Sequence, residues 1–190
     1  MKSPTITADA LCEYLVSPPT RRRMLLERAK YPALGSDPFA AARSLIVGFL
    51  LDQDAAALRA RAETTGRGFA AALAFAESWA RVPCPFDVAP SEPGAIDVGP
   101  VRVTRASPDV RLTGVRGDPM RGGLALLFGE ASERMAQIRN ALMARASGSS
   151  DSLTTIVLGS WLVEHHGFAP IVQRDIEAAC DEIARMWATV

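Results

Sequence analysis

Lysine, the side chain on which several common enzyme mechanisms depend, is almost missing from this chain. Of its 21 basic residues, only Lys2 and Lys30 are lysines and the rest are arginines. A Schiff-base lysine, a P-loop lysine or the lysine of a metal-dependent nuclease would therefore have to be one of these two residues. This count alone disfavours those mechanisms.

The histidines and cysteines also lack partners in the sequence. His165 and His166 are the only histidines, and no carboxylate follows them at i+3 or i+4. We therefore interpret them as part of a surface loop. The three cysteines, Cys12, Cys84 and Cys180, are far apart and show no Cys-x-x-Cys spacing. This pattern indicates reduced thiols rather than a zinc site or a disulfide framework.

Arginines are concentrated between residues 98 and 121. Five arginines there face only two aspartates, a local charge of +3, whereas the whole chain has 21 basic and 21 acidic residues. A neutral chain argues against binding nucleic acid through bulk charge, but a planar guanidinium can still bind phosphate locally. The alternative is that these arginines form the solvated face of alternating strands. The candidates for nucleic-acid binding are Arg102, Arg105, Arg111 and Arg116, with Arg121 nearby.

The first 82 residues predict a helical N-terminal part. Thr7 is placed to cap a helix through Leu15, and two prolines precede a second helix over Thr20–Lys30. Apolar residues recur at helical spacing from Phe39 to Leu50. Two further helices are expected over 54–65 and 67–81.

The second part, residues 95–190, predicts a sheet. The run 122–128 is continuously apolar, as is typical of a strand buried on both faces. A helix that leads from it to a parallel strand satisfies the crossover rule. The expected elements are strands 98–106, 109–115 and 122–128, helix 130–146, strand 153–161 and helix 175–187.

These elements predict a single α/β (α+β) domain. A helical N-terminal layer packs on a mixed sheet of four or five strands, with the core order α-β-β-β-α-β and a C-terminal helix. The proline-rich stretch 82–94 is expected to be irregular, and the stretch from 162 to 172 fits either a short strand or a loop.

This order of elements resembles the core of the restriction-endonuclease-like PD-(D/E)XK family. Pro108-Asp109 looks like the Pro-Asp pair at the start of that family's second strand. The runs 15–30 and 175–187 also resemble an uncharacterised bacterial family with this core. The resemblance implies that Asp109 is the first of two acids that hold a divalent metal, and that the third strand carries an acid and a lysine that activate water.

The third strand departs from that pattern, because Gly123 and Ala125 stand where the acid and the lysine would be. Asp109 is then more simply interpreted as a solvated residue that caps a turn at the start of the strand. Glu77 on the preceding helix is a candidate for a migrated ligand. Glu130 is better explained as a first-turn acid that interacts with the helix dipole.

We therefore expect a non-catalytic binding or interaction protein that needs no cofactor. The first alternative is a Mg²⁺-dependent nuclease that uses Asp109 and Glu77, and the second is a homodimeric assembly protein. The longest apolar run, Ser44–Leu51, is too short to span a bilayer, and the first residues lack a signal-peptide apolar region. These features predict a cytoplasmic protein that does not enter the membrane.

Overall fold

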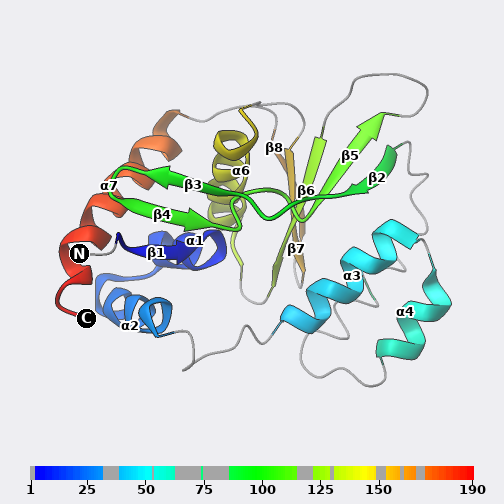
Figure 1. The fold of residues 1–190 in the computed structure, drawn as a ribbon, viewed down its shortest axis with the longest axis horizontal. Helices are drawn as coiled ribbons and strands as arrows, with labels where there is room; N and C mark the ends of the chain where they lie inside the picture. The colour runs from blue at the N-terminus through cyan, green and yellow to red at the C-terminus, as the bar shows by residue number, and fades with distance from the viewer. Residues whose placement is uncertain are drawn as a thin grey trace.

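Two β-sheets with helices packed around them form the described part of the chain (Figure 1). The computed structural model describes residues 3–31, 39–52, 54–62, 74, 86–114, 122–128, 131–148, 153–158, 161–165 and 170–190. One sheet has three strands and the other has five. The mixed α/β class predicted from the sequence is confirmed.

The two helices near the N-terminus begin where the sequence predicts them. α1 (Ala8–Val16) starts after Thr7, whose hydroxyl accepts a hydrogen bond from the Ala10 N–H at 3.2 Å. α2 (Pro19–Lys30) has its proline in the first turn, where the missing N–H costs no helical hydrogen bond. Both helices contact α7 (Pro170–Trp187), so segments from opposite ends of the chain lie side by side.

The three-stranded sheet was not predicted as a separate unit. In spatial order it consists of β1 (Thr5–Thr7), β4 (Val101–Thr104) and β3 (Ala95–Val98). β1 runs parallel to β4, and β3 runs antiparallel to it. Its inner face packs on α1, α6 (Glu133–Ser147) and α7 through the buried residues Ile6, Val98, Val101 and Val103.

The prediction of one strand over 98–106 is therefore wrong in both extent and partners. Val98 ends β3, and the turn that follows contains Gly99 with a φ of 55°. β4 ends at Thr104, because Arg105 has a φ of 56° and turns the chain out of the sheet. The left-handed conformation interrupts an extended strand.

The five-stranded sheet contains the elements on which the fold prediction rests. Its spatial order is β2 (Phe86–Pro90), β5 (Val110–Gly114), β6 (Gly122–Phe128), β7 (Leu153–Leu158) and β8 (Trp161–His165). β6 and β7 are parallel and α6 lies between them in the chain, while the other neighbours are antiparallel. The expected helical connection between two parallel strands is therefore present.

Two strands of this sheet come from segments that the sequence left irregular or ambiguous. β2 lies within 82–94, which was expected to be irregular, and pairs with β5 from Phe86 opposite Gly114 to Pro90 opposite Val110. It is an edge strand, where proline is tolerated because one side of the strand needs no donors. The ambiguous stretch after residue 161 begins with β8.

The two faces of the larger sheet are covered by different helices. α3 (Ala40–Asp52) and α4 (Ala55–Ala62) pack on β5 and β6, whereas α6 covers the opposite face. β6 is accordingly buried on both faces, as its composition predicted. The residues of the α3 side are Ile46, Phe49, Leu50, Leu58, Val110, Leu124 and Leu126.

Within the described ranges, no helix is long and apolar enough to cross a lipid bilayer. The predicted helix 67–81 lies outside the described residues, apart from residue 74.

The contact between α1, α2 and α7 includes a buried tyrosine. The Tyr14 hydroxyl donates to the Met186 sulfur at 3.6 Å, and the Arg22 guanidinium lies 5.2 Å from the ring centroid. Arg22 is in turn 2.9 Å from a carboxylate oxygen of Glu182. Burial, and then the negative charge of Glu182, raise the pKa of Tyr14 from 10.0 to about 12.

We therefore expect the free energy of unfolding to fall as pH rises from 10.0 to about 12. In this range the unfolded chain releases the phenolic proton and the folded chain retains it, so alkali favours unfolding. Urea unfolding of the wild type and of Tyr14→Phe at about pH 9 and about pH 11 measures the effect. The buried cysteine thiols change the free energy of unfolding in the same direction. The difference in pH dependence between the wild type and Tyr14→Phe therefore isolates the contribution of the tyrosine. Equal pH dependence in both would contradict the prediction.

Candidate functional site

Asp109, the acid that the family resemblance marks as a metal ligand, is held by hydrogen bonds to the protein itself. Its carboxylate accepts the Leu126 N–H at 2.8 Å and an N–H of Arg43 at 3.0 Å. Its own backbone N–H donates to the Leu124 carbonyl at 2.8 Å. The side chain is 13% exposed. Asp109 therefore fixes the start of β5 against β6.

Arg43 reaches Asp109 from α3 and is itself almost completely buried, with 8% of its side chain exposed. One terminal nitrogen, Nη1, donates to the Leu126 carbonyl at 2.7 Å and to Asp109. The other, Nη2, donates to a carboxylate oxygen of Asp9 at 2.6 Å. The guanidinium carbon lies 5.2 Å from the centroid of the Phe128 ring. Hydrogen bonds to carboxylate and carbonyl oxygens and a cation–π contact with the Phe128 ring together hold the guanidinium in one position.

A second buried arginine, Arg139 on α6, binds the chain just before Asp109. Its two terminal nitrogens donate to the carbonyls of Ala106 and Ser107, each at 2.8 Å. Its Nε lies 3.5 Å from the other carboxylate oxygen of Asp9, and 2% of the side chain is exposed. The segment that leads from β4 to β5 is therefore held by a guanidinium from the helix beneath it.

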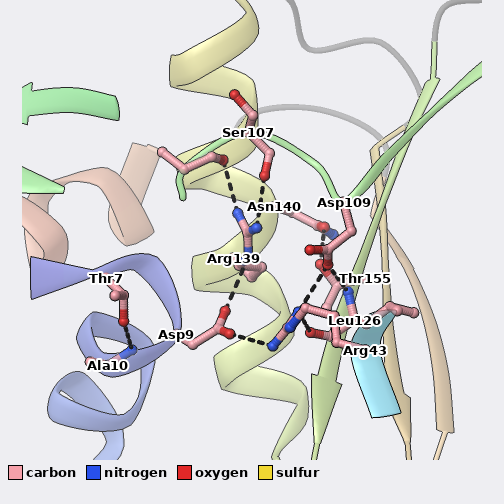
Figure 2. A network of polar contacts seen from close by, with 11 residues as sticks. Thr7, Asp9, Ala10, Arg43, Ser107, Asp109, Leu126, Arg139, Asn140 and Thr155 are labelled. Atoms are coloured by element: carbon pink, nitrogen blue, oxygen red, sulfur yellow. Dashed lines mark hydrogen bonds and ion pairs between the residues drawn. The ribbon is translucent and has the colours of Figure 1, made fainter. Parts of the chain in front are cut away.

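Asp9, Arg43, Asp109 and Arg139 together form what we call the arginine–carboxylate cluster (Figure 2). Its members come from α1, α3, the segment before β5, and α6. Two guanidinium groups balance two carboxylates, so the cluster is formally neutral. Buried charges are tolerated when they are paired and hydrogen-bonded in this way.

Three oxygen atoms converge on the Arg43 guanidinium: one from Asp9, one from Asp109 and the carbonyl of Leu126. Carboxylate and carbonyl oxygens are also the ligands preferred by Mg²⁺ and Ca²⁺. The Arg43 guanidinium therefore lies among oxygen atoms of the kinds that bind these metal ions. Among the described residues, no group of three or more His, Cys, Asp or Glu side chains is placed to hold a metal ion.

The neighbouring strand β6 supplies no acid or lysine to this place. Gly123 and Ala125, which stand where the family pattern has an acid and a lysine, are both buried in the sheet. Lys30, the lysine that the structure describes, donates instead to the Trp187 carbonyl at the end of α7, at 2.9 Å. Within the described ranges, no lysine is near Asp109.

A pocket of about 390 Å³ opens beside the arginine–carboxylate cluster. It lies between α3 and the segments 91–93 and 105–109. Arg43 and Asp109 form part of its wall. The remaining lining residues are Ser44, Val47, Gly48, Leu51, Ser91, Pro93, Arg105, Ser107 and Pro108.

The structure places the described arginines of the predicted patch on different elements. Arg102 is exposed on the three-stranded sheet, 3.8 Å from Asp97. Arg111 is exposed on β5 and donates to the Pro90 carbonyl. Its neighbours in the strand face α3, so Arg111 projects from the opposite face. Of these predicted arginines, Arg105 lines the pocket.

Several residues singled out in the sequence lie outside the described residues, so the structure does not place their side chains. They are Glu77, Cys84, Arg116, Arg121, Glu130 and His166. The backbone of His165 is described: it ends β8 opposite Leu153, so the interpretation of this residue as part of a surface loop is wrong.

The two described cysteines offer no activated nucleophile. Cys12 and Cys180 are buried free thiols. Burial, reinforced by the charge of Asp9, raises the pKa of Cys12. Burial, and then Asp181, raise the pKa of Cys180 to about 12. A nucleophilic cysteine needs a lowered pKa, so neither thiol fits that role.

Sequence reasoning missed Asp9, Arg43 and Arg139. Each arginine did leave a signal, because it interrupts an apolar stripe. Arg43 lies three residues before Ile46, and Arg139 lies three before Leu142, so both are on the buried faces of their helices. An arginine at such a position can indicate a buried ion pair, although its long side chain often reaches solvent instead.

Comparison with solved structures finds a distant likeness. No family model and no curated protein matches the chain. A crystal structure of the archaeal protein SSO0001 superimposes with a TM-score of 0.43 and 11% sequence identity, over 100% of this chain and 77% of that one.

We expect Asp109→Ala to lower the free energy of unfolding by about 3–5 kcal/mol, because it leaves buried Arg43 without one of its carboxylates. In a double-mutant cycle with Arg43→Ala, the two losses should be strongly non-additive. Urea unfolding monitored by circular dichroism measures both quantities.

The exposed pair Arg23–Glu27, with an N···O distance of 3.2 Å, is the matched control. Glu27→Gln should cost no more than about 0.5 kcal/mol. An equally small cost for Asp109→Ala would contradict a structural role for that carboxylate.

Proposed function

We propose that this protein is a non-catalytic binding protein with a nuclease-like core, in which Arg43 stands where an active relative would hold its metal ion. The observation that carries the proposal is the position of the Arg43 guanidinium between Asp9, Asp109 and the Leu126 carbonyl. Arginine stays protonated at all ordinary pH values, so its charge is permanent.

Energetics support this reading. A metal ion held by these same three oxygens could bind only if Arg43 withdrew from them. Leaving such a buried charge without its hydrogen-bond partners costs several kcal/mol. Mg²⁺ also retains its waters strongly and needs one or two free carboxylates. The described carboxylates of this site are already paired with arginines.

The chemistry of the site supports it as well. Metal-assisted hydrolysis requires a metal that activates water, and in the PD-(D/E)XK pattern a lysine assists. The described part of β6 provides Gly123 and Ala125 instead. What remains beside the cluster is a pocket with polar and apolar walls, which is a feature of binding sites.

Nucleic acid is a possible partner within this proposal, since Arg102 and Arg111 are exposed. Their separation on two sheets supports weak, separate contacts rather than one continuous groove. Affinity for nucleic acid should then fall with salt, and each arginine replaced by alanine should reduce it by a small, similar factor.

The decisive test compares the wild type with Arg43→Ala. The wild type should cleave neither DNA nor RNA in Mg²⁺ or Mn²⁺, and neither ion should raise its melting temperature. Arg43→Ala leaves the Asp9 and Asp109 carboxylates without their shared cation, so Mn²⁺ should bind and raise the melting temperature of this variant. Isothermal calorimetry and thermal denaturation measure the gain.

The double variant Arg43→Ala with Asp109→Asn is the control, because it should lose the response to Mn²⁺. Metal-dependent cleavage by the wild type that disappears in Asp109→Asn would overturn the proposal in favour of the nuclease alternative. Light scattering that shows a stable dimer would instead support the assembly alternative.

A further inference from the structure

The pocket beside the arginine–carboxylate cluster has one wall made by a single face of α3. Ser44, Val47, Gly48 and Leu51 follow each other at i, i+3, i+4 and i+7, so they form a stripe along the helix. A Cβ atom built on Gly48 would meet nothing within 4 Å. The glycine therefore leaves a hollow in this wall, beside the apolar side chains of Val47 and Leu51.

The opposite wall consists of two segments that are held tightly together. The Ala106 N–H donates to the Gly94 carbonyl at 2.9 Å. A Cβ atom on Gly94 would collide with the Ser107 side chain, so only glycine allows this close approach. Arg139 binds the carbonyls of Ala106 and Ser107. The pocket is therefore a built feature of the fold.

Both walls offer apolar surface to a ligand. Val47 and Leu51 lie on the helical wall, and Pro93 and Pro108 lie on the wall opposite. The volume of the pocket is about 390 Å³, near the lower end of small-molecule sites. A flat ring between two such walls buries both of its faces and loses little conformational freedom, whereas a flexible chain loses more. The shape of the pocket therefore favours a small ring compound.

The charged groups in and behind this pocket balance one another among the described residues. Glu92 is counted with them, because it lies between two lining residues of the same segment. Arg105 already interacts with other groups of the protein. A charged ligand would therefore lose its hydration without meeting an unbalanced charge of opposite sign, so the pocket favours an uncharged one. Three arginines stand against three carboxylates: Arg43, Arg105 and Arg139 against Asp9, Asp109 and Glu92.

One strong hydrogen-bond acceptor of the pocket wall remains open. Both hydrogen bonds to the Asp109 side chain, from the Leu126 N–H and from Arg43, end on the same oxygen, Oδ2 (Figure 2). No described residue donates to the other oxygen, Oδ1, and this atom is not sealed in the interior. Because Asp109 lines the pocket, a ligand there can donate a hydrogen bond to Oδ1.

We propose that this pocket binds an uncharged heteroaromatic compound through a ring N–H group. The ring lies over the hollow at Gly48, between α3 and the two prolines, and its N–H donates to Oδ1 of Asp109. A ring N–H points in the plane of the ring, so it reaches a side chain at the edge while both faces stay against apolar walls. This inference rests on the proposed binding function and names the class of its ligand.

Indole and 1-methylindole are the probes, titrated into the full chain by NMR or isothermal calorimetry. The two molecules share one ring system, but 1-methylindole lacks the N–H donor. Indole should bind with a millimolar dissociation constant, and 1-methylindole should bind at least about tenfold more weakly, because a hydrogen bond to a charged group is lost. Equal affinities would overturn the proposal, and so would the absence of indole binding at about 10 mM.

A substitution on α3 tests the position of the ring. Gly48→Leu fills the hollow, so it should weaken indole binding by at least about tenfold. Its melting temperature should not fall, because glycine is a poor helix former. Ala60→Leu is the matched control: it adds a leucine to an exposed position of α4 outside the pocket and should leave the affinity unchanged. If Gly48→Leu binds indole as tightly as the wild type does, the proposal is wrong.

Charged analogues test the neutrality of the ligand. Indole-3-acetate and tryptamine carry a negative and a positive charge on the same ring system, and both should bind more weakly than indole. Tighter binding of either one would contradict an uncharged ligand. A single-stranded oligonucleotide should not displace indole, and displacement would assign the pocket to a base of nucleic acid instead. The proposed function fails separately, through metal-dependent cleavage by the wild type, so the two failures are distinguishable.

Discussion

The burial of the Arg43 guanidinium is the constraint on which much of the structure depends. A buried cation must be satisfied by acceptors with good geometry, and Arg43 takes its acceptors from α1, the segment before β5, and β6. α3 can therefore dock on the larger sheet only when Asp9 is also in place. Because α1 belongs to the apolar cluster of the smaller sheet and α3 to that of the larger sheet, the Asp9–Arg43 ion pair connects two separate hydrophobic clusters. Arg139, on α6, pairs with the same Asp9 and binds the carbonyls of the segment that leads to β5.

Much of the fold could be predicted because its signals are local. The continuous apolar run of β6, the periodicity of α6 and the amphipathic α7 each indicate their structure within a few residues. β1 and β2 could not be predicted so easily. β1 has three residues and is defined by its pairing with β4, and β2 ends in a proline that is tolerated because β2 is an edge strand among the strands that the structure describes. The division into two sheets follows from the backbone of Arg105, which no periodicity reveals.

The candidate site was predictable only in part for a related reason. Pro108-Asp109 was recognisable as the start of a strand, and its carboxylate is indeed central. What the sequence could not show was its partner, because Arg43 is 66 residues away and the pair forms only when α3 packs on β6. The same three oxygens would suit a divalent ion held at about 2.0–2.6 Å or a planar guanidinium. Here the three oxygens lie 2.6–3.0 Å from the guanidinium nitrogens, the ordinary length of such hydrogen bonds.

Neutrality within the arginine–carboxylate cluster then determines what the adjoining pocket can recognise. Because Asp9 and Asp109 are balanced by Arg43 and Arg139, the cluster adds rigidity to the pocket but little net charge. Arg105 is the other charged residue among the described lining residues. A chain with equal numbers of acidic and basic residues can in this way pair its buried charges internally, beside a pocket whose wall they help to form.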